Sequence, residues 1–211
     1  MTLAPIACIV LAGGRSIRMV DHNKVFAPLA GKPLVQHVID RIRPQVDALA
    51  LSVESTSPVF EAFGLAQLPD PTPGFRGPLG GLLAALRHFA NSHEWVVVVP
   101  CDAPFVPPDF VKALHDRATE AAAHCAVVVY EDETQPTFSI WHRGLLAELE
   151  IAVGQDGLSG FKQFMRTIPV ARLDWPPAEP PPFFNINDPA ALERASSWLQ
   201  PAGETACKCS A

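Results

Sequence analysis

The sequence predicts an α/β domain in which a mostly parallel β-sheet lies between two layers of helices. Short apolar runs rich in β-branched residues alternate along the chain with longer segments of helical periodicity. Several of these runs are apolar throughout, as strands are when helices cover both faces of a sheet. Strand–helix alternation favours parallel pairing, because each helix returns the chain to the start of the next strand. The length of 211 residues suits one domain with a sizeable core.

The first half of the chain is expected to contribute two strands and two helices. Residues 6–11 and 48–53 are apolar runs of strand length. A helix is expected to begin at Pro33, and its apolar face consists of Leu34, Val35, Val38, Ile39, Ile42 and Val46. A second amphipathic helix follows Gly77-Pro78, and its apolar face consists of Leu79, Leu82, Leu83, Leu86 and Phe89.

The next part of the chain continues the alternation. Residues 95–100 contain four consecutive valines and predict a strand. A helix is expected from Pro108, followed by strands over residues 126–130 and 138–141.

The C-terminal part is less regular. Residues 174–184 contain too many prolines for a helix or a central strand. A last helix is expected over residues 189–199, capped by Asn187 or Asp188. We expect residues 1–200 to form a single domain and the polar residues 201–211 a disordered tail.

Composition excludes several classes of protein. Sixteen basic and 22 acidic residues give a net charge of −6, without the basic face that general nucleic-acid binding needs. Neither a secretory signal nor an apolar stretch of membrane-spanning length is recognisable, so we expect a cytoplasmic protein with no nucleic-acid or membrane partner. Cys8 and Cys125 lie in apolar runs and are expected to be reduced core residues, whereas a redox or metal role stays open for Cys207 and Cys209.

A loop rich in glycine and cations follows the first predicted strand. Gly13 and Gly14 let the backbone approach an anion closely, and Arg15, Arg18 and Lys24 follow within the same loop. Two glycines alone indicate no more than a tight turn, but the three cations supply charge that fits a triphosphate. The spacing matches neither a dinucleotide-binding motif nor a P-loop.

A single carboxylate follows the valine-rich strand. In parallel α/β sheets ligands bind outside the carboxyl ends of the strands, so Asp102 is expected to face the same crevice as the glycine loop. Mg²⁺ prefers one or two carboxylates together with phosphate oxygens and water. Asp102 is therefore a candidate Mg²⁺ ligand, and a turn cap before Pro104 is the alternative.

Several motifs in order resemble the molybdenum cofactor guanylyltransferase family of nucleotidyltransferases. The first is residues 11–19, Leu-Ala-Gly-Gly-Arg-Ser-Ile-Arg-Met, followed by Lys24. The others are GKPLVQHVIDRI (31–42), GPLGGLLAAL (77–86), PCDAPFVPP (100–108), QPTFSIW (135–141) and FNINDPAAL (184–192). The resemblance covers nearly the whole chain and implies a Rossmann-like three-layer nucleotidyltransferase fold with a mostly parallel central sheet. Related cytidylyl enzymes typically have Leu-Ala-Ala-Gly, so Gly13-Gly14 favours guanine.

The resemblance implies a reaction and a set of site residues. A terminal phosphate of molybdopterin, or of its molybdenum-loaded form, would attack the α-phosphate of GTP and expel pyrophosphate, with Mg²⁺ as the cofactor. GTP and the pterin are then the substrates, with transient contact to cofactor-delivery proteins or molybdoenzymes also expected. The implied GTP-binding residues are Leu11, Ala12, Gly13, Gly14, Lys24, Asp70 and Asp102, the catalytic residues are Arg18, Lys24 and Asp102, the metal ligand is Asp102, and the pterin-binding residues are Asn185 and Asn187.

Three departures from the family pattern keep two alternatives open. Val20 stands where a glycine is usual, Asn23 where an aspartate precedes the lysine, and Ser52 where an asparagine often contacts the nucleotide. One alternative is a nucleotidyltransferase that uses another nucleotide or phosphate acceptor. The other is a GTP-binding accessory protein without turnover.

Overall fold

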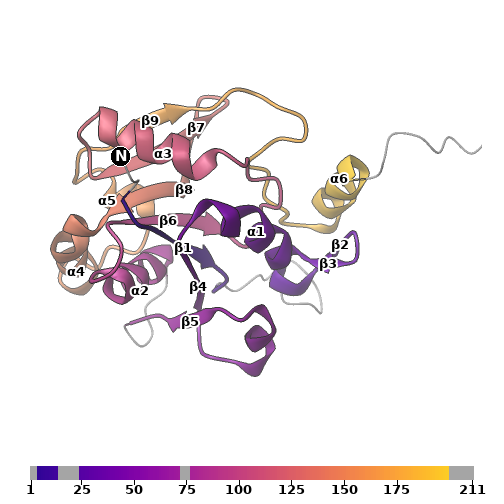
Figure 1. Ribbon diagram of the computed structural model, residues 1–211, viewed down its shortest axis with the longest axis horizontal. Helices are drawn as coiled ribbons and strands as arrows, with labels where there is room; N and C mark the ends of the chain where they lie inside the picture. Colours follow the sequence, from indigo (N-terminus) through magenta and orange to yellow (C-terminus); the bar gives the residue numbers. More distant parts are fainter. Residues whose placement is uncertain (1–3, 14–23, 72–76, 200–211) are drawn as a thin grey trace, which may run out of the picture.

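The computed structural model describes residues 4–13, 24–71 and 77–199, and in them a seven-stranded sheet lies between two helical layers (Figure 1). The strand order is β5-β4-β1-β6-β8-β7-β9. The strands are β1 (Ile6–Leu11), β4 (Ala48–Val53), β5 (Ala66–Pro69), β6 (Trp95–Pro100), β7 (Cys125–Tyr130), β8 (Glu133–His142) and β9 (Ala171–Asp174), and a separate hairpin pairs β2 (Pro28–Leu29) with β3 (Lys32–Pro33).

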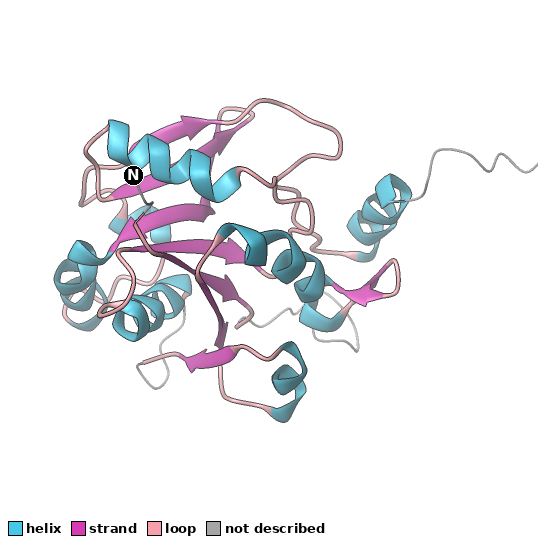
Figure 2. Ribbon diagram, viewed as in Figure 1, coloured by secondary structure: helices cyan, strands magenta, loops and turns pink. Residues whose placement is uncertain are grey.

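Helices cover both faces of the sheet, as expected (Figure 2). The helices are α1 (Leu34–Ile42), α2 (Pro78–Phe89), α3 (Phe110–Glu120), α4 (Leu146–Gly154), α5 (Phe161–Phe164) and α6 (Pro189–Leu199). Residues of α1 and α3 pack on one face of the sheet with Cys8, Val10, Val97 and Val99. Residues of α2, α4 and α5 pack on the other face with Ala7, Ile9, Val96 and Val98. Successive side chains of β1 and β6 point to opposite faces of the sheet, and helices cover both faces. Both strands are therefore uninterrupted apolar runs in the sequence.

The sheet is mostly parallel, with β8 reversed. Strands β4, β5 and β6 run in the direction of β1, whereas β8 pairs antiparallel with both β6 and β7. The reason lies in the connection: only Glu131 and Asp132 separate β7 from β8, and both have positive φ, 51° and 62°. Two such residues make a tight hairpin, which has no helix to carry the chain back. β8 therefore spans residues 133–142, more than the predicted 138–141.

Some predicted boundaries were wrong by a few residues. α1 ends at Ile42, because Pro44 enters a short 3-10 segment, η2 (Arg43–Gln45), so Val46 lies beyond the helix. α3 begins at Phe110 instead of Pro108. The short strands β5 and β9 and the helices α4 and α5 were not predicted. Strand β5 has only four residues and their burial does not alternate, so its pattern carries little signal.

A group of histidines lies at the edge of the sheet where β6 begins. His142, the last residue of β8, pairs with Trp95, and its ring stacks on His124 with 4.7 Å between centroids. Its Nδ1 accepts a hydrogen bond from the Gly144 N–H at 3.1 Å, and its Nε2 lies 3.4 Å from Glu94 Oε1. Burial lowers the pKa of His142, and the charge of His124 lowers it further, against the opposite effect of Glu94.

Acidification is expected to destabilise the fold through His142. Its pKa is lower in the folded protein than the ordinary value of 6.5, so the unfolded chain takes up more protons as the pH falls through that value. The free energy of unfolding should therefore fall as the pH is lowered from 7.5 to 5.5. His142→Asn keeps an acceptor for Gly144 but does not titrate, so urea unfolding of this variant should show a shallower pH dependence than the parent. If the free energy of unfolding had the same pH dependence in the parent and in His142→Asn, His142 would not be the cause of the destabilisation.

Candidate active site

The first part of the site lies where β1 ends, between β4 and β6. The Leu11 carbonyl accepts a hydrogen bond from the Cys101 N–H at 3.2 Å, and the Ala12 N–H donates to the Ser52 carbonyl at 2.9 Å. These bonds extend the pairing of β1 beyond its last residue, to β6 on one side and β4 on the other. Leu11 and Ala12 are therefore held in a fixed position at the carboxyl edge of the sheet.

Gly13 continues this path against the end of β4. A Cβ atom on Gly13 would lie 3.3 Å from the Glu54 nitrogen and 3.3 Å from the Val53 carbonyl carbon. Because backbone atoms cannot give way as a flexible side chain can, this close approach favours glycine. Gly14, Arg15 and Arg18 lie outside the described residues.

Lys24 marks the return of the loop to the described part of the chain. It begins the short 3-10 segment η1 (Lys24–Phe26), and the placement of its side chain lies outside what the structure describes. The next residue, Val25, is buried in the same core cluster as Ala12 and Val53. The backbone at Lys24 is therefore anchored to the core that carries the glycine segment.

Two carboxylates stand at the ends of neighbouring strands. Asp70 directly follows β5, and Glu54 directly follows β4, with which β5 pairs up to Val53 and Pro69. Burial raises the pKa of Asp70, and the negative charge of Glu54 raises it further. Groups that offer hydrogen-bond donors or positive charge are favoured beside such a pair. Asp70 was predicted for the site, whereas Glu54 was not, because it is one of many acidic residues in a loop.

Ser52 and the first turn of α2 are packed against each other. A Cβ atom on Gly81 would lie 2.5 Å from Ser52 Oγ and 2.9 Å from Leu11 Cδ2. Ser52 is itself buried. The small residues at both positions thus let α2 lie directly on the ends of β1 and β4. The motif GPLGG was recognised in the sequence, but not this contact, which depends on the tertiary structure.

Asp102 follows the end of β6, which lies on the other side of β1 from β4 and β5. Asp102 is only 8% exposed, and its backbone carbonyl accepts a hydrogen bond from the Ile186 N–H at 2.9 Å. This bond brings a segment 84 positions further along the chain to the side of Asp102. Asn185 and Asn187 flank Ile186, and Asn187 is exposed.

A third small core holds this segment in place. Ile186 is fully buried there together with Ala27, Leu29, Leu34, Phe105, Ala191 and Ala195. Figure 1 shows α6 beside the β2–β3 hairpin at the right of the view, and the two elements contact each other. Asp188 caps α6 as predicted, since its Oδ1 accepts a hydrogen bond from the Ala191 N–H at 2.7 Å.

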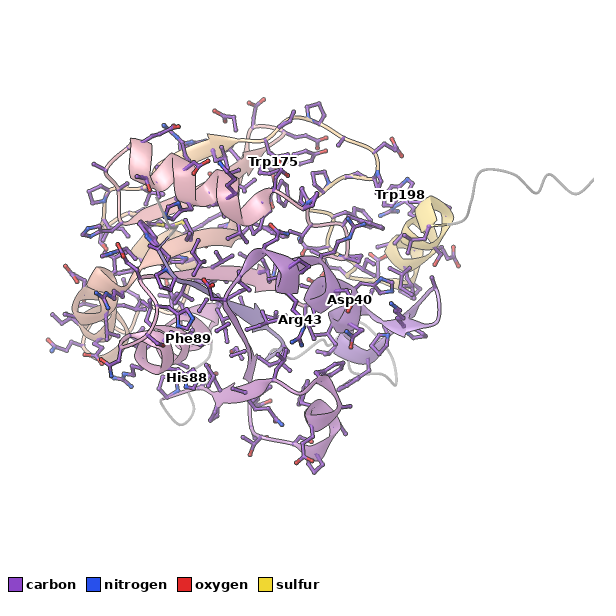
Figure 3. All side chains as sticks on the ribbon, viewed as in Figure 1. Asp40, Arg43, His88, Phe89, Trp175 and Trp198 are labelled. Carbon is purple, nitrogen blue, oxygen red and sulfur yellow. The ribbon has the colours of Figure 1, made fainter. Side chains whose placement is uncertain are left out.

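Aromatic contacts support the proline-rich segment that precedes Asn185. Trp198, labelled on α6 in Figure 3, donates a hydrogen bond from its indole nitrogen to Glu179 Oε1 at 2.8 Å and meets Phe184 edge to face. Phe183 packs against Phe138 of β8 with 4.8 Å between ring centroids. The motif QPTFSIW is thus in contact with Phe183, the residue directly before FNINDPAAL, although the two are far apart in sequence.

The described residues contain no group of three or more His, Cys, Asp or Glu side chains placed to hold a metal ion. A metal that takes most of its ligands from protein is therefore not supported by the described part of the chain. A single carboxylate such as Asp102 fits Mg²⁺, which is commonly held by one or two carboxylates and the phosphates of its substrate.

Arg143 lies far from this edge. Its N–H donates to the Glu94 carbonyl, and its guanidinium donates to the Ala90 carbonyl at 3.2 Å, both near the start of β6. The start of β6 is the opposite edge of the sheet from Asp102. Arg143 therefore does not belong to the candidate site.

The fold is that of the nucleotidyltransferase class. A structure described as molybdopterin-guanine dinucleotide biosynthesis protein A from Archaeoglobus fulgidus matches with a TM-score of 0.73 at 24% identity, covering 90% of this chain and 97% of that one. The 4-diphosphocytidyl-2C-methyl-D-erythritol synthase from Anaerococcus prevotii matches with a TM-score of 0.70 at 11% identity, covering 93% and 98%. At these identities the likeness concerns the fold.

Sequence comparison gives the family. The model of the MobA-like NTP transferase domain matches residues 8–171. A molybdenum cofactor guanylyltransferase of Rhodopseudomonas palustris is 36% identical over 190 residues, which is 89% of this chain and 90% of that protein. One of Rhizobium meliloti is 36% identical over 199 residues, 90% of each chain. The chain belongs to the MobA-like NTP transferase family.

Proposed function

We propose that this protein transfers GMP from GTP to the terminal phosphate of molybdopterin or the molybdenum cofactor, releasing pyrophosphate. Relatives of nearly the same length are named molybdenum cofactor guanylyltransferase, which supports both the reaction and the substrates. The observation that carries the proposal is the adjacency of the Leu11–Gly13 segment and Asp102 at the ends of two paired central strands. We further propose that the reaction takes place in the cytoplasm. No helix in the described part of the chain is long and apolar enough to cross a membrane.

The sheet order suggests how two substrates would share one edge. Strands β5, β4 and β1 are followed by Asp70, Glu54 and Gly13, and this half is proposed to bind GTP. Guanine carries N–H donors on its pairing edge, including the N2 amino group, which suit the carboxylates there. The segment with Asn185 and Asn187, proposed for the pterin, lies beside Asp102, which follows β6, and the preceding Phe183 packs on β8. Asp102 stands between the two halves, where the α-phosphate would meet the attacking phosphate.

The chemistry needs alignment and charge neutralisation more than proton transfer. An oxygen of the pterin phosphate forms a bond to the α-phosphorus of GTP, the bond from that phosphorus to the bridging oxygen breaks, and pyrophosphate leaves with the electron pair. The attacking oxygen is already an anion at neutral pH, so no general base is required, unlike in a kinase that activates a hydroxyl. Gly13 and Gly14 are proposed to admit the phosphates, and Lys24 and Arg18 to offset their charge.

Asp102 is the proposed ligand of Mg²⁺. Bound there, Mg²⁺ would neutralise phosphate charge and polarise the phosphoryl group. The backbone of Asp102 is fixed by Ile186 and by the end of β6, so its carboxylate leaves the sheet from a rigid position.

Pyrophosphate release tests the proposal directly. The purified protein should release pyrophosphate from Mg-GTP in the presence of molybdopterin, and much less from CTP or with sugar phosphates as acceptors. Turnover with a sugar phosphate in place of the pterin would support the other acceptor class. GTP binding without pyrophosphate release would support the non-catalytic alternative.

Asn187→Asp is expected to separate the two substrates. The change places a carboxylate beside an anionic pterin, so the KM for molybdopterin should rise about tenfold, as for an unfavourable contact worth about 1.4 kcal/mol. Calorimetry should show an unchanged Kd for GTP. Asp188→Asn, which keeps an acceptor for the α6 cap, is the neighbouring control and should alter neither constant. A parallel loss of GTP affinity in Asn187→Asp would place Asn187 on the nucleotide side.

A further inference from the structure

A tight turn before α5 is locked by one side chain. Gln163 Oε1 accepts hydrogen bonds from two successive backbone N–H groups, those of Ser159 at 3.1 Å and Gly160 at 3.0 Å. This is the arrangement in which a glutamine at the third helical position reaches back to the residue that precedes the helix. The flanking residues Phe161 and Phe164 are buried against Trp141 of β8, so the base of the turn is held by the core.

The locked turn contacts the beginning of α2. The Ser159 carbonyl accepts a hydrogen bond from the Leu79 N–H at 3.2 Å. A Cβ atom on Gly77 would lie only 2.3 Å from that carbonyl oxygen and 2.7 Å from Ser159 Cβ. Gly77 also has a φ of 157°, so both its space and its backbone conformation suit glycine. Ser159 thus caps the first turn of α2 with a backbone acceptor from a distant part of the chain.

The first turn of α2 in turn contacts the nucleotide side of the site. Gly81 packs on Ser52 and Leu11, at the ends of β4 and β1. Gly77 is also the residue at which the chain that leaves Asp70 returns to the described part of the structure. A continuous series of contacts therefore runs from Gln163 through Ser159 and α2 to Leu11.

We propose that Gln163 is a positioning residue for GTP binding, which holds Ser159 against the first turn of α2 and thereby fixes α2 on Leu11 and Ser52. This inference rests on the proposed function of the same site. Gln163 does not contact the substrates. Without its side chain the Ser159 turn relaxes, so the first turn of α2 is no longer held in place before GTP binds. The affinity for GTP falls, because ordering the first turn of α2 then costs free energy on binding.

The matched pair Gln163→Leu and Gln163→Glu tests the hydrogen bonds separately from the volume. Leucine fills similar space without an acceptor, whereas glutamate keeps an oxygen that both N–H groups can reach. Gln163→Leu should raise the Kd for GTP about tenfold, the usual effect of losing one or two such bonds. Gln163→Glu should restore most of the affinity. Gln155→Leu, the same change at an exposed glutamine just before the turn, should leave the Kd unchanged.

A comparison of the effects on GTP and on molybdopterin distinguishes positioning of the GTP site from general destabilisation of the protein. For Gln163→Leu, calorimetry should show the weaker GTP binding, while the kcat at saturating GTP and the KM for molybdopterin stay within about twofold of the parent. Equal losses for both substrates, or a Gln163→Glu variant as weak as Gln163→Leu, would overturn the proposal.

Gly77→Ala disturbs the contact between Ser159 and α2 from the α2 side. It tests the proposal even if Gln163→Leu does not fold. Its new methyl group would displace the Ser159 carbonyl, so GTP affinity should fall here as well. Combined with Gln163→Leu, its effect should be less than additive, because both changes break one contact. Full additivity in the double variant, or a Gly77→Ala protein with the parent Kd, would overturn the proposal. A parent protein that binds no GTP would instead overturn the proposed function itself.

Discussion

Asp102→Asn is expected to keep its fold and to lose at least about a hundredfold in turnover. The amide has nearly the volume of the carboxylate but no negative charge, so it holds Mg²⁺ poorly. Metal stabilisation of charge in a transition state is worth several kcal/mol, and each 1.36 kcal/mol is a factor of ten. The hydrogen bond that joins residue 102 to Ile186 involves the backbone carbonyl, so the substitution leaves it in place.

Pyrophosphate release measured over a Mg²⁺ titration checks this expectation. The loss should be largest at limiting Mg²⁺ and should shrink as the metal is raised, since weaker binding is partly overcome by concentration. Asp109→Asn is the matched control: Asp109 is exposed, lies seven positions further along the chain and makes no side-chain cap for α3. If Asp102→Asn releases pyrophosphate like the parent at limiting Mg²⁺, the role of Asp102 is that of a turn cap.

The sequence predicts the adjacency of Gly13 and Asp102 because local pattern decides it. The runs that become β1 and β6 are apolar at every position, and only strands buried on both faces need that composition. Once those strands are recognised, the rule that ligands bind at carboxyl ends places Gly13 and Asp102 at one edge. The pairing of Leu11 with Pro100 confirms that the two segments are adjacent.

Contacts between distant segments were not predictable in the same way. Nothing in the local pattern of Ser159 indicates that its carbonyl caps α2, and nothing near Ile186 indicates a hydrogen bond to Asp102. Both depend on how helices and loops pack against the sheet. The reversed strand β8 is an intermediate case, since its tight turn at Glu131 and Asp132 is local but is formed by residues without a glycine.

The proposed division of the site into a GTP half and a pterin half would explain why Asp102 carries so large an expected effect. GTP and the pterin are both polyanions and repel each other at the point where they must react. In the proposed arrangement, the carboxylates Glu54 and Asp70 lie on the base side, away from the junction, and the cations of the glycine loop lie on the phosphate side. Asp102 would contribute to neutralisation only through the metal, so its loss would leave the junction with an excess of negative charge.

Lys24→Ala is expected to lower kcat by about tenfold to a hundredfold and to weaken GTP binding less. Charge-assisted hydrogen bonds are worth roughly 1.5–3 kcal/mol. Negative charge grows on the departing pyrophosphate as the bond to the α-phosphorus breaks, so a lysine at the phosphates stabilises the transition state more than the bound substrate. Arg18→Ala should behave in the same way, since its proposed role is also at the pyrophosphate.

Steady-state kinetics for kcat, with GTP affinity measured separately by calorimetry, distinguish this role from simple binding. Lys32→Ala is the matched control, because Lys32 forms an exposed ion pair with Asp40 at 3.1 Å, and exposed pairs contribute little to stability. Its kcat and Kd should equal those of the parent. A Lys24→Ala variant whose GTP affinity falls while its kcat equals that of the parent would show that Lys24 acts in substrate binding alone. If Lys24→Ala binds and turns over GTP like Lys32→Ala, the glycine loop does not hold phosphates, and the proposed transfer reaction loses its main chemical support.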